Sequence, residues 1–185
     1  MRRLIVIVVM ILLSVSAGSC RKQIDGFDLF VVKAGENPCN GNRFHPYSRE
    51  SLDFEFKVDG TWIWDDISPA GVNGWSKIAG FAESIDHKKN RIVLAVRYES
   101  GKIICGAYGD ADGVGFYEKI CELQVGGTYF TRISIEGDYY VIRIDGYEYK
   151  HLIGTKHLVG VRLNPHVGGD YTLGHDWRVL IKWIK

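Results

Sequence analysis

Apolar and polar residues alternate with a period of two along much of this chain. The segment SLDFEFKV at positions 51–58 places Leu52, Phe54 and Phe56 on one side and charged residues on the other. Similar alternation returns in YVIRID at 140–145 and in WRVLIKWIK at 177–185. A period of two is typical of β-strands with one buried face, and the sequence shows no sustained helical stripe. The pattern therefore predicts strands along the chain.

Pairs of turn-forming residues separate these runs. They are Asp59-Gly60, Ser100-Gly101, Asp112-Gly113, Gly126-Gly127, Glu136-Gly137 and Asp145-Gly146. Such pairs favour tight hairpins, and the intervals between them match strand lengths. The spacing predicts about ten to twelve antiparallel strands, which a domain of this size must stack in two sheets. The expected fold class is all-β, a two-sheet antiparallel sandwich or jelly roll.

The segment MRRLIVIVVMILLSVSAGSC at positions 1–20 has the layout of a secretory signal peptide. Two arginines precede an unbroken apolar run at 4–13, and small residues lead up to Cys20. The run is too short to span a bilayer permanently. A cysteine directly after Ala-Gly-Ser resembles a bacterial lipobox, so residues 1–19 are expected to be removed and Cys20 to be lipidated. Ordinary cleavage nearby is the alternative. The lipobox predicts an exported protein, anchored by lipid in the bacterial cell envelope at the outer membrane or cell surface.

The remaining 166 residues are expected to form a tether at 20–26 and a single β-sandwich domain at 27–185. Of the 23 basic and 22 acidic residues in the chain, Arg2 and Arg3 leave with the signal peptide, so that 21 and 22 remain. A mature chain so close to neutral is not expected to bind nucleic acid.

Three cysteines lie beyond Cys20, an odd number for an exported protein, which predicts one disulfide and one free thiol. Cys105 and Cys121 sit symmetrically about Gly113, in a segment that the pattern predicts to be two strands around a loop. A disulfide needs Cα atoms about 5.5 Å apart, which opposed antiparallel residues provide. The expected bridge joins Cys105 to Cys121, and a bridge from Cys39 to either of them is the alternative.

The segment YYVIRIDGYEY at 139–149 resembles the strand, Asp-Gly turn and strand of concanavalin-like and laminin-G-like jelly rolls. Four longer segments together resemble a group of secreted or lipid-anchored proteins of Bacteroidetes-type bacteria. They are VVKAGENPCNGNRFHPY, LDFEFKVDGTWIWDD, KIAGFAESIDHKKNRIVLAVRY and LNPHVGGDYTLGHDWRVLIKWIK. The resemblance covers most of the mature chain and implies a concanavalin-like jelly roll. The sequence departs from the group's pattern at Val167, where an aromatic residue is usual, and at Gly174, where proline is usual.

Glycan binding without chemistry is the function that these features favour. Aromatic rings hold the apolar faces of sugars, while planar polar side chains meet the hydroxyl groups. The candidate ligand-binding residues are Trp62, Trp64, His87, Arg91, Arg97, Tyr98, Tyr108 and Tyr117. Trp62 and Trp64 alternate in GTWIWDD and would share one face, although burial in the core is the alternative for this pair. The expected partner is a glycan or polysaccharide, and no cofactor is required.

Three other functions remain open. A polysaccharide lyase needs a cation to neutralise the uronate carboxylate and a Tyr or His to move the proton, and the same candidate residues supply these groups. Asp53 and Glu55 have the spacing of paired carboxylates in a glycoside hydrolase, but their alternation with apolar residues favours a solvated strand face. An adhesin that engages protein through a sheet edge fits the same fold.

The segment NPHVGGDYTLGHDW at 164–177 gathers His166, Asp170, His175 and Asp176. The spacing does not match a transition-metal site held by regular structure, and the glycines predict a loop in which Asp176 accepts backbone hydrogen bonds. Jelly-roll carbohydrate modules often bind calcium where the first and last strands meet. A structural calcium ion held by Asp176 and Glu36 is therefore the alternative, and catalysis by the two histidines is a third interpretation.

Overall fold

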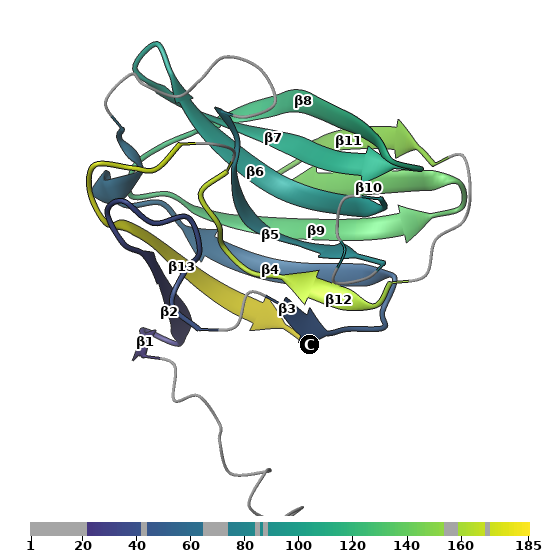
Figure 1. Ribbon diagram of the computed structural model, residues 1–185, viewed down its shortest axis with the longest axis horizontal. Coiled ribbons are helices and arrows are strands. Elements are labelled where there is room, and N and C mark those ends of the chain that lie inside the picture. Colours follow the sequence, from purple (N-terminus) through teal and green to yellow (C-terminus); the bar gives the residue numbers. More distant parts are fainter. Residues whose placement is uncertain are drawn as a thin grey trace, which may run out of the picture.

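The computed structural model describes residues 22–41, 44–64, 74–83, 86, 89–153, 159–168 and 171–185, which form two stacked antiparallel sheets (Figure 1). Sheet A contains, in spatial order, β1 (Gln23–Ile24), β2 (Phe27–Val32), β13 (Trp177–Ile184), β4 (Ser51–Lys57), β9 (Thr128–Glu136), β10 (Tyr139–Ile144) and β11 (Tyr147–Leu152). Sheet B contains β3 (Phe44–Pro46), β12 (Val161–Leu163), β5 (Ser76–Ala82), β6 (Arg91–Glu99), β7 (Lys102–Ala111) and β8 (Val114–Leu123). The predicted all-β, two-sheet antiparallel fold is confirmed.

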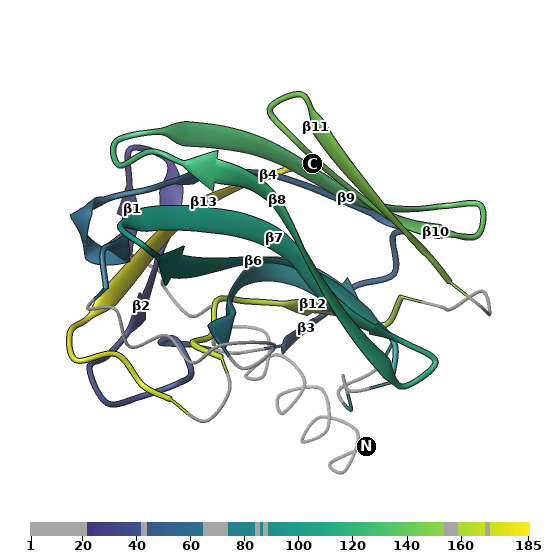
Figure 2. The ribbon, with the colours of Figure 1, turned by 90° about the horizontal axis from the view of Figure 1, so that it is seen from above.

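The chain passes repeatedly from one sheet to the other, which produces the jelly-roll topology. Strand β3 belongs to sheet B and β4 to sheet A, β5 to β8 follow in sheet B, and β9 to β11 return to sheet A. The last strand, β13, lies between β2 and β4, so both ends of the domain meet in sheet A. Figure 2 shows the two layers stacked, with β8 and β11 at the same side of the sandwich.

Tight turns close the hairpins where the sequence predicts them. Both residues of Ser100-Gly101, Asp112-Gly113 and Asp145-Gly146 have positive φ, the conformation that two-residue hairpin turns of the favoured hand require. Asp59-Gly60 behaves differently. The Asp59 carboxylate accepts a hydrogen bond of 2.8 Å from the Thr61 amide and caps the short 3-10 helix η1 (Gly60–Trp62).

The core fills the space between the sheets with alternate residues from facing strands. Phe54 and Phe56 of β4 are fully buried and belong to the same continuous apolar cluster as Ile92 and Leu94 of β6. This arrangement places the intervening residues of each strand on an outer face.

Among the described residues, no helix has the length and apolar character needed to cross a membrane. The predicted signal peptide and Cys20 lie outside the described residues.

Candidate functional site

The outer face of sheet B gathers four of the eight predicted ligand-binding residues. Arg91 and Arg97 are on β6, alternating with the core residues of that strand. Tyr108 of β7 pairs in register with Tyr117 of β8, and the next outward position of β7, Asp110, pairs with Arg91. Directly opposed residues of neighbouring strands point to the same side, so register alone brings these side chains together.

Arg91, Asp110 and Tyr108 form a compact polar group on this face. The Arg91 guanidinium makes an ion pair with the Asp110 carboxylate, and its Nη2 donates a hydrogen bond of 3.2 Å to the Tyr108 hydroxyl. The guanidinium carbon lies 4.9 Å from the centre of the Tyr108 ring, and Lys77 Nζ lies 4.6 Å from the same ring. Tyr108 therefore has two cations against its ring. Sequence reasoning missed Lys77.

Arg97 and Trp75 form a second group farther along β6. The guanidinium carbon of Arg97 lies 5.7 Å from the Trp75 ring, and Arg97 Nη2 lies 3.4 Å from Oε1 of Glu99. The Trp75 ring also lies 6.5 Å from the Tyr117 ring, measured between centroids. Trp75 has room because a glycine occupies position 106, where a Cβ atom would approach the indole Cη2 to 2.6 Å. Sequence reasoning missed Trp75 as well.

Three of the four remaining predicted ligand-binding residues, Trp62, Trp64 and Tyr98, lie elsewhere. Trp62 and Trp64 are only 1% and 3% exposed and pack edge-on against Trp177, with ring centroids 5.4 Å and 5.9 Å apart. The placement of this pair on a sugar-binding face is therefore wrong, because Trp62, at the end of the 3-10 helix, and Trp64, just after it, both pack into the core. Tyr98 packs against the core on the side of β6 opposite to Arg97, where it lines a pocket of about 300 Å³ at one end of the sandwich. His87 lies outside the described residues.

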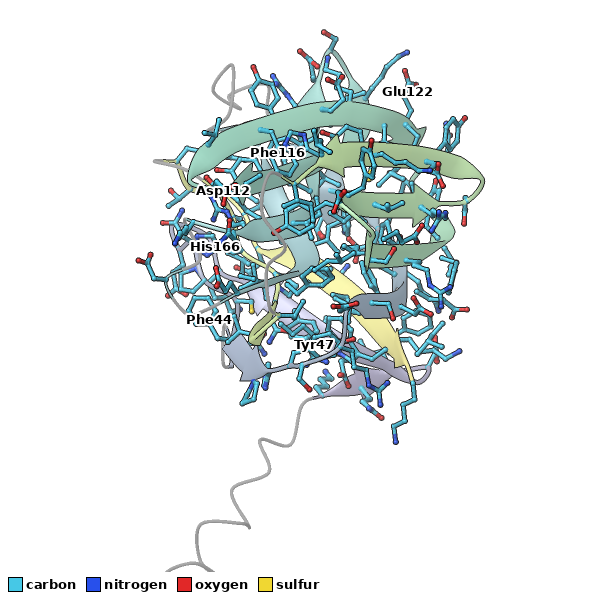
Figure 3. The ribbon with its side chains drawn as sticks, turned by 90° about the vertical axis from the view of Figure 1, so that its right-hand side faces the viewer. Phe44, Tyr47, Asp112, Phe116, Glu122 and His166 are labelled. Atoms are coloured by element: carbon cyan, nitrogen blue, oxygen red, sulfur yellow. The ribbon has the colours of Figure 1, made fainter. Side chains whose placement is uncertain are left out.

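The described residues of the cluster predicted at 164–177, His166, His175 and Asp176, do not converge on one point. The backbone of His166 pairs with Lys77 of sheet B, and Figure 3 shows His166 on the sheet B side of the molecule. His175 instead donates from Nε2 to the Thr61 carbonyl oxygen over 3.0 Å. Asp170 lies outside the described residues.

Asp176 holds the N-terminal loop to the last strand through protein partners. One carboxylate oxygen is 2.6 Å from Lys33 Nζ, and the other accepts a hydrogen bond of 3.0 Å from the Ala34 amide. These two bonds, the lysine first, lower the pKa of Asp176. No cluster of three or more His, Cys, Asp or Glu side chains suited to a metal ion occurs in the described part of the chain, and Glu36 is exposed.

The carboxylates considered for glycoside hydrolysis lie on the outer face of sheet A. Asp53 receives two hydrogen bonds from the Arg132 guanidinium, at 2.8 Å and 2.6 Å. Glu55 lies 3.2 Å from Lys182 Nζ. Each carboxylate is thus neutralised by a neighbour on an adjacent strand, which is the solvated face that the alternation favours.

Cys105 and Cys121 are direct cross-strand partners, as their positions in the sequence predict. The turn at 112–113 would by itself oppose Cys105 to Ile120, but an irregularity in the ladder next to Cys105 shifts the register by one residue. Both thiols are free in the structure, and burial raises the pKa of Cys105. The disulfide stays a prediction.

No protein-family model matches the chain, and no curated protein matches its sequence. Solved structures do share its fold. The marine PL7 alginate lyase AlyA1 from Zobellia galactanivorans is 13% identical with a TM-score of 0.56, over 92% of this chain and 84% of that one. The alginate lyase AlyC3 is 10% identical with a TM-score of 0.59, over 84% and 72%. A laminarinase catalytic domain from Thermotoga petrophila is 12% identical with a TM-score of 0.53, over 86% and 76%. These likenesses show that the chain folds as a concanavalin-like jelly roll.

Proposed function

We propose that this protein binds glycans on the outer face of sheet B and performs no chemistry on them. The observation that carries the proposal is the convergence of Tyr108, Tyr117, Arg91 and Arg97 on one face through strand register. Aromatic rings and planar polar groups are the side chains that hold sugar rings and their hydroxyls. The similar solved structures, alginate lyases and a laminarinase by their names, support a polysaccharide as the partner.

The two longer edge strands, β8 of sheet B and β11 of sheet A, favour this proposal over adhesion through an added strand. The long edge strand β8 carries Glu118, Lys119 and Glu122, and β11 carries Glu148 and Lys150. Charged side chains on edge strands are a common protection against pairing with another chain.

A polysaccharide panel tests the proposal. The purified protein would be tested for retention on immobilised polysaccharides that include polyuronates, sulfated galactans and neutral β-glucans. The proposal predicts retention on at least one of them without any change in the polymer. If no polysaccharide in a broad panel is retained or altered, glycan binding is not the function.

Lyase activity is a second candidate, favoured by the surroundings of Tyr108. Its hydroxyl lies 3.2 Å from Arg91 Nη2, and Lys77 Nζ lies over the ring, so a proton-moving group and cations for a uronate carboxylate occur together. The panel would then show unsaturated products by ultraviolet absorbance. Tyr108→Phe should abolish product formation while leaving retention on the polymer unchanged, whereas a pure binder gives no product in either form.

We also propose that the protein is a cell-envelope lipoprotein whose glycan partner is met outside the cytoplasm. The support is the apolar run at 4–13 followed by Cys20. Cys20→Ala should abolish labelling with a radioactive fatty acid and partitioning into detergent. A variant that partitions like the wild type would show that lipid is not attached at this cysteine.

A further inference from the structure

We propose that Arg97 binds an acidic group of the glycan, a carboxylate or a sulfate, and makes the site selective for anionic polysaccharides. The inference rests on the proposed glycan-binding function and adds the chemical class of the ligand. It depends on a charge balance that differs between the two arginines of β6.

Arg97 is largely buried, and its Nε has no hydrogen-bond acceptor among the described residues. Its side chain is 10% exposed, and a guanidinium has five N–H donors. Among the described residues, its one ion-pair contact joins Nη2 to Glu99 Oε1 at 3.4 Å. A charge withdrawn from water is costly unless it is paired and hydrogen-bonded. Arg91 differs, because Asp110 and Tyr108 both accept its hydrogen bonds.

The carboxylate beside Arg97 is shared with another cation. Lys119 Nζ lies 2.5 Å from Glu99 Oε2, closer than Arg97 lies to the other oxygen. The group of Arg97, Glu99 and Lys119 therefore holds two positive charges and one negative charge. An added anionic oxygen would balance the charge and supply the acceptor that the guanidinium lacks.

Trp75 connects Arg97 to an exposed aromatic ring on the same face. Its indole lies against the Arg97 guanidinium. The same indole lies beside Tyr117, which is 46% exposed, so a sugar chain that rests on Tyr117 can reach the Arg97 group.

The test compares a polyuronate with its carboxyl-reduced derivative, which has the same backbone without charge, and includes a sulfated galactan as a second anionic polymer. Binding would be measured by isothermal titration calorimetry at two salt concentrations. The wild type should bind one or both anionic polymers, should bind the reduced polymer much more weakly, and should lose affinity for the anionic polymer as salt rises. The polymer that binds distinguishes carboxylate from sulfate recognition.

Arg97→Gln should weaken binding to the anionic polymer about tenfold, since charge-assisted bonds are among the stronger ones. Binding to the reduced polymer should change less than about twofold. Lys119→Gln, on an exposed side chain, should weaken anionic binding by a smaller factor and still fold normally. The matched control is Lys182→Gln, which removes one positive charge from the outer face of sheet A and should change neither affinity.

Melting temperatures provide the check on folding. Arg97→Gln should melt at or above the wild type without ligand, because an incompletely neutralised buried charge is removed. Equal affinity of the wild type for the charged and reduced polymers would overturn the inference while leaving glycan binding intact. Equal losses on both polymers in Arg97→Gln would also overturn it. Absence of binding to every polymer would reject both the inference and the proposed function.

Discussion

The outer faces of the two sheets use their charges differently. On sheet A, Arg143 bonds both Glu136 and Glu148, and Asp53 bonds Arg132, so neighbouring strands neutralise one another in solvent. On sheet B, Lys102 and Glu122 also pair in solvent, but Arg91 and Arg97 are withdrawn among aromatic rings, and Arg97 Nε has no hydrogen-bond acceptor among the described residues. The first arrangement contributes solubility, whereas the second leaves binding capacity that a ligand can use. Substitutions on the two faces should therefore have measurably different consequences.

The buried ion pair on sheet B should contribute far more to stability than its counterpart on sheet A. Asp110→Ala leaves the Arg91 charge buried and should lower the free energy of unfolding by about 3 kcal/mol or more. Asp53→Ala removes the partner of the exposed Arg132 and should cost about 1 kcal/mol or less. Chemical denaturation of both variants measures the contrast. Equal losses would mean that the two faces do not differ in this respect.

A disulfide between Cys105 and Cys121 would tie together the two strands that carry Tyr108 and Tyr117. Closing this loop should contribute about 3 kcal/mol to the free energy of unfolding, which reduction would remove. Peptide mapping of the exported protein under non-reducing conditions identifies the bridge. A bridge that contains Cys39 would replace this assignment.

The close approach of β8 and Trp75 to Gly106 should make this position intolerant of a side chain. Gly106→Ala places a methyl group 2.4 Å from the Glu118 carbonyl oxygen and 2.6 Å from the indole Cη2, and should cost about 1 to 3 kcal/mol. Gly115→Ala on the adjacent strand is the matched control, because its Cβ would meet no atom closer than 3.5 Å and should cost well under 1 kcal/mol. A neutral Gly106→Ala would show that neither the β8 backbone nor Trp75 approaches this position so closely.

The sequence predicts the binding residues that β6 to β8 place on the outer face of sheet B, but it does not predict Trp75 and Lys77, which lie beside them. Arg91, Arg97, Tyr108 and Tyr117 come together because alternation and two-residue hairpin turns are local properties of β6 to β8. Trp75 and Lys77 were missed because β5 has a register shift between Lys77 and Ala79, which breaks the alternation. Their positions depend on pairing with distant segments, which no local pattern encodes.

Trp62 and Trp64 were, in contrast, assigned to the binding face although they are buried in the core. The sequence GTWIWDD alternates like a strand, but the Asp59 cap starts a 3-10 turn, and burial of both indoles stabilises the core. A capping aspartate before a short apolar run is the local signal that could have indicated a turn.

The smallest expected effect concerns Asp176, which lies outside both faces. Because its pKa is lowered in the folded state, its contribution to stability is present at neutral pH and lost as the pH falls through and below the unfolded value of about 4. Asp176→Asn should therefore lower the melting temperature at pH 7 and have little effect near pH 2. A calcium ion at this site makes a different prediction, that chelation lowers the melting temperature of the wild type and not of the variant.

Glycan binding on sheet B is tested most directly by comparing two exposed tyrosines. Tyr117 lies on the outer face of sheet B, and Tyr147, which is 56% exposed, lies on the edge strand of sheet A. Affinity for the polysaccharide identified in the panel should fall about tenfold in Tyr117→Ala and stay within about twofold of the wild type in Tyr147→Ala. Unchanged affinity in Tyr117→Ala, or a loss confined to Tyr147→Ala, would contradict the assignment of the binding face to sheet B.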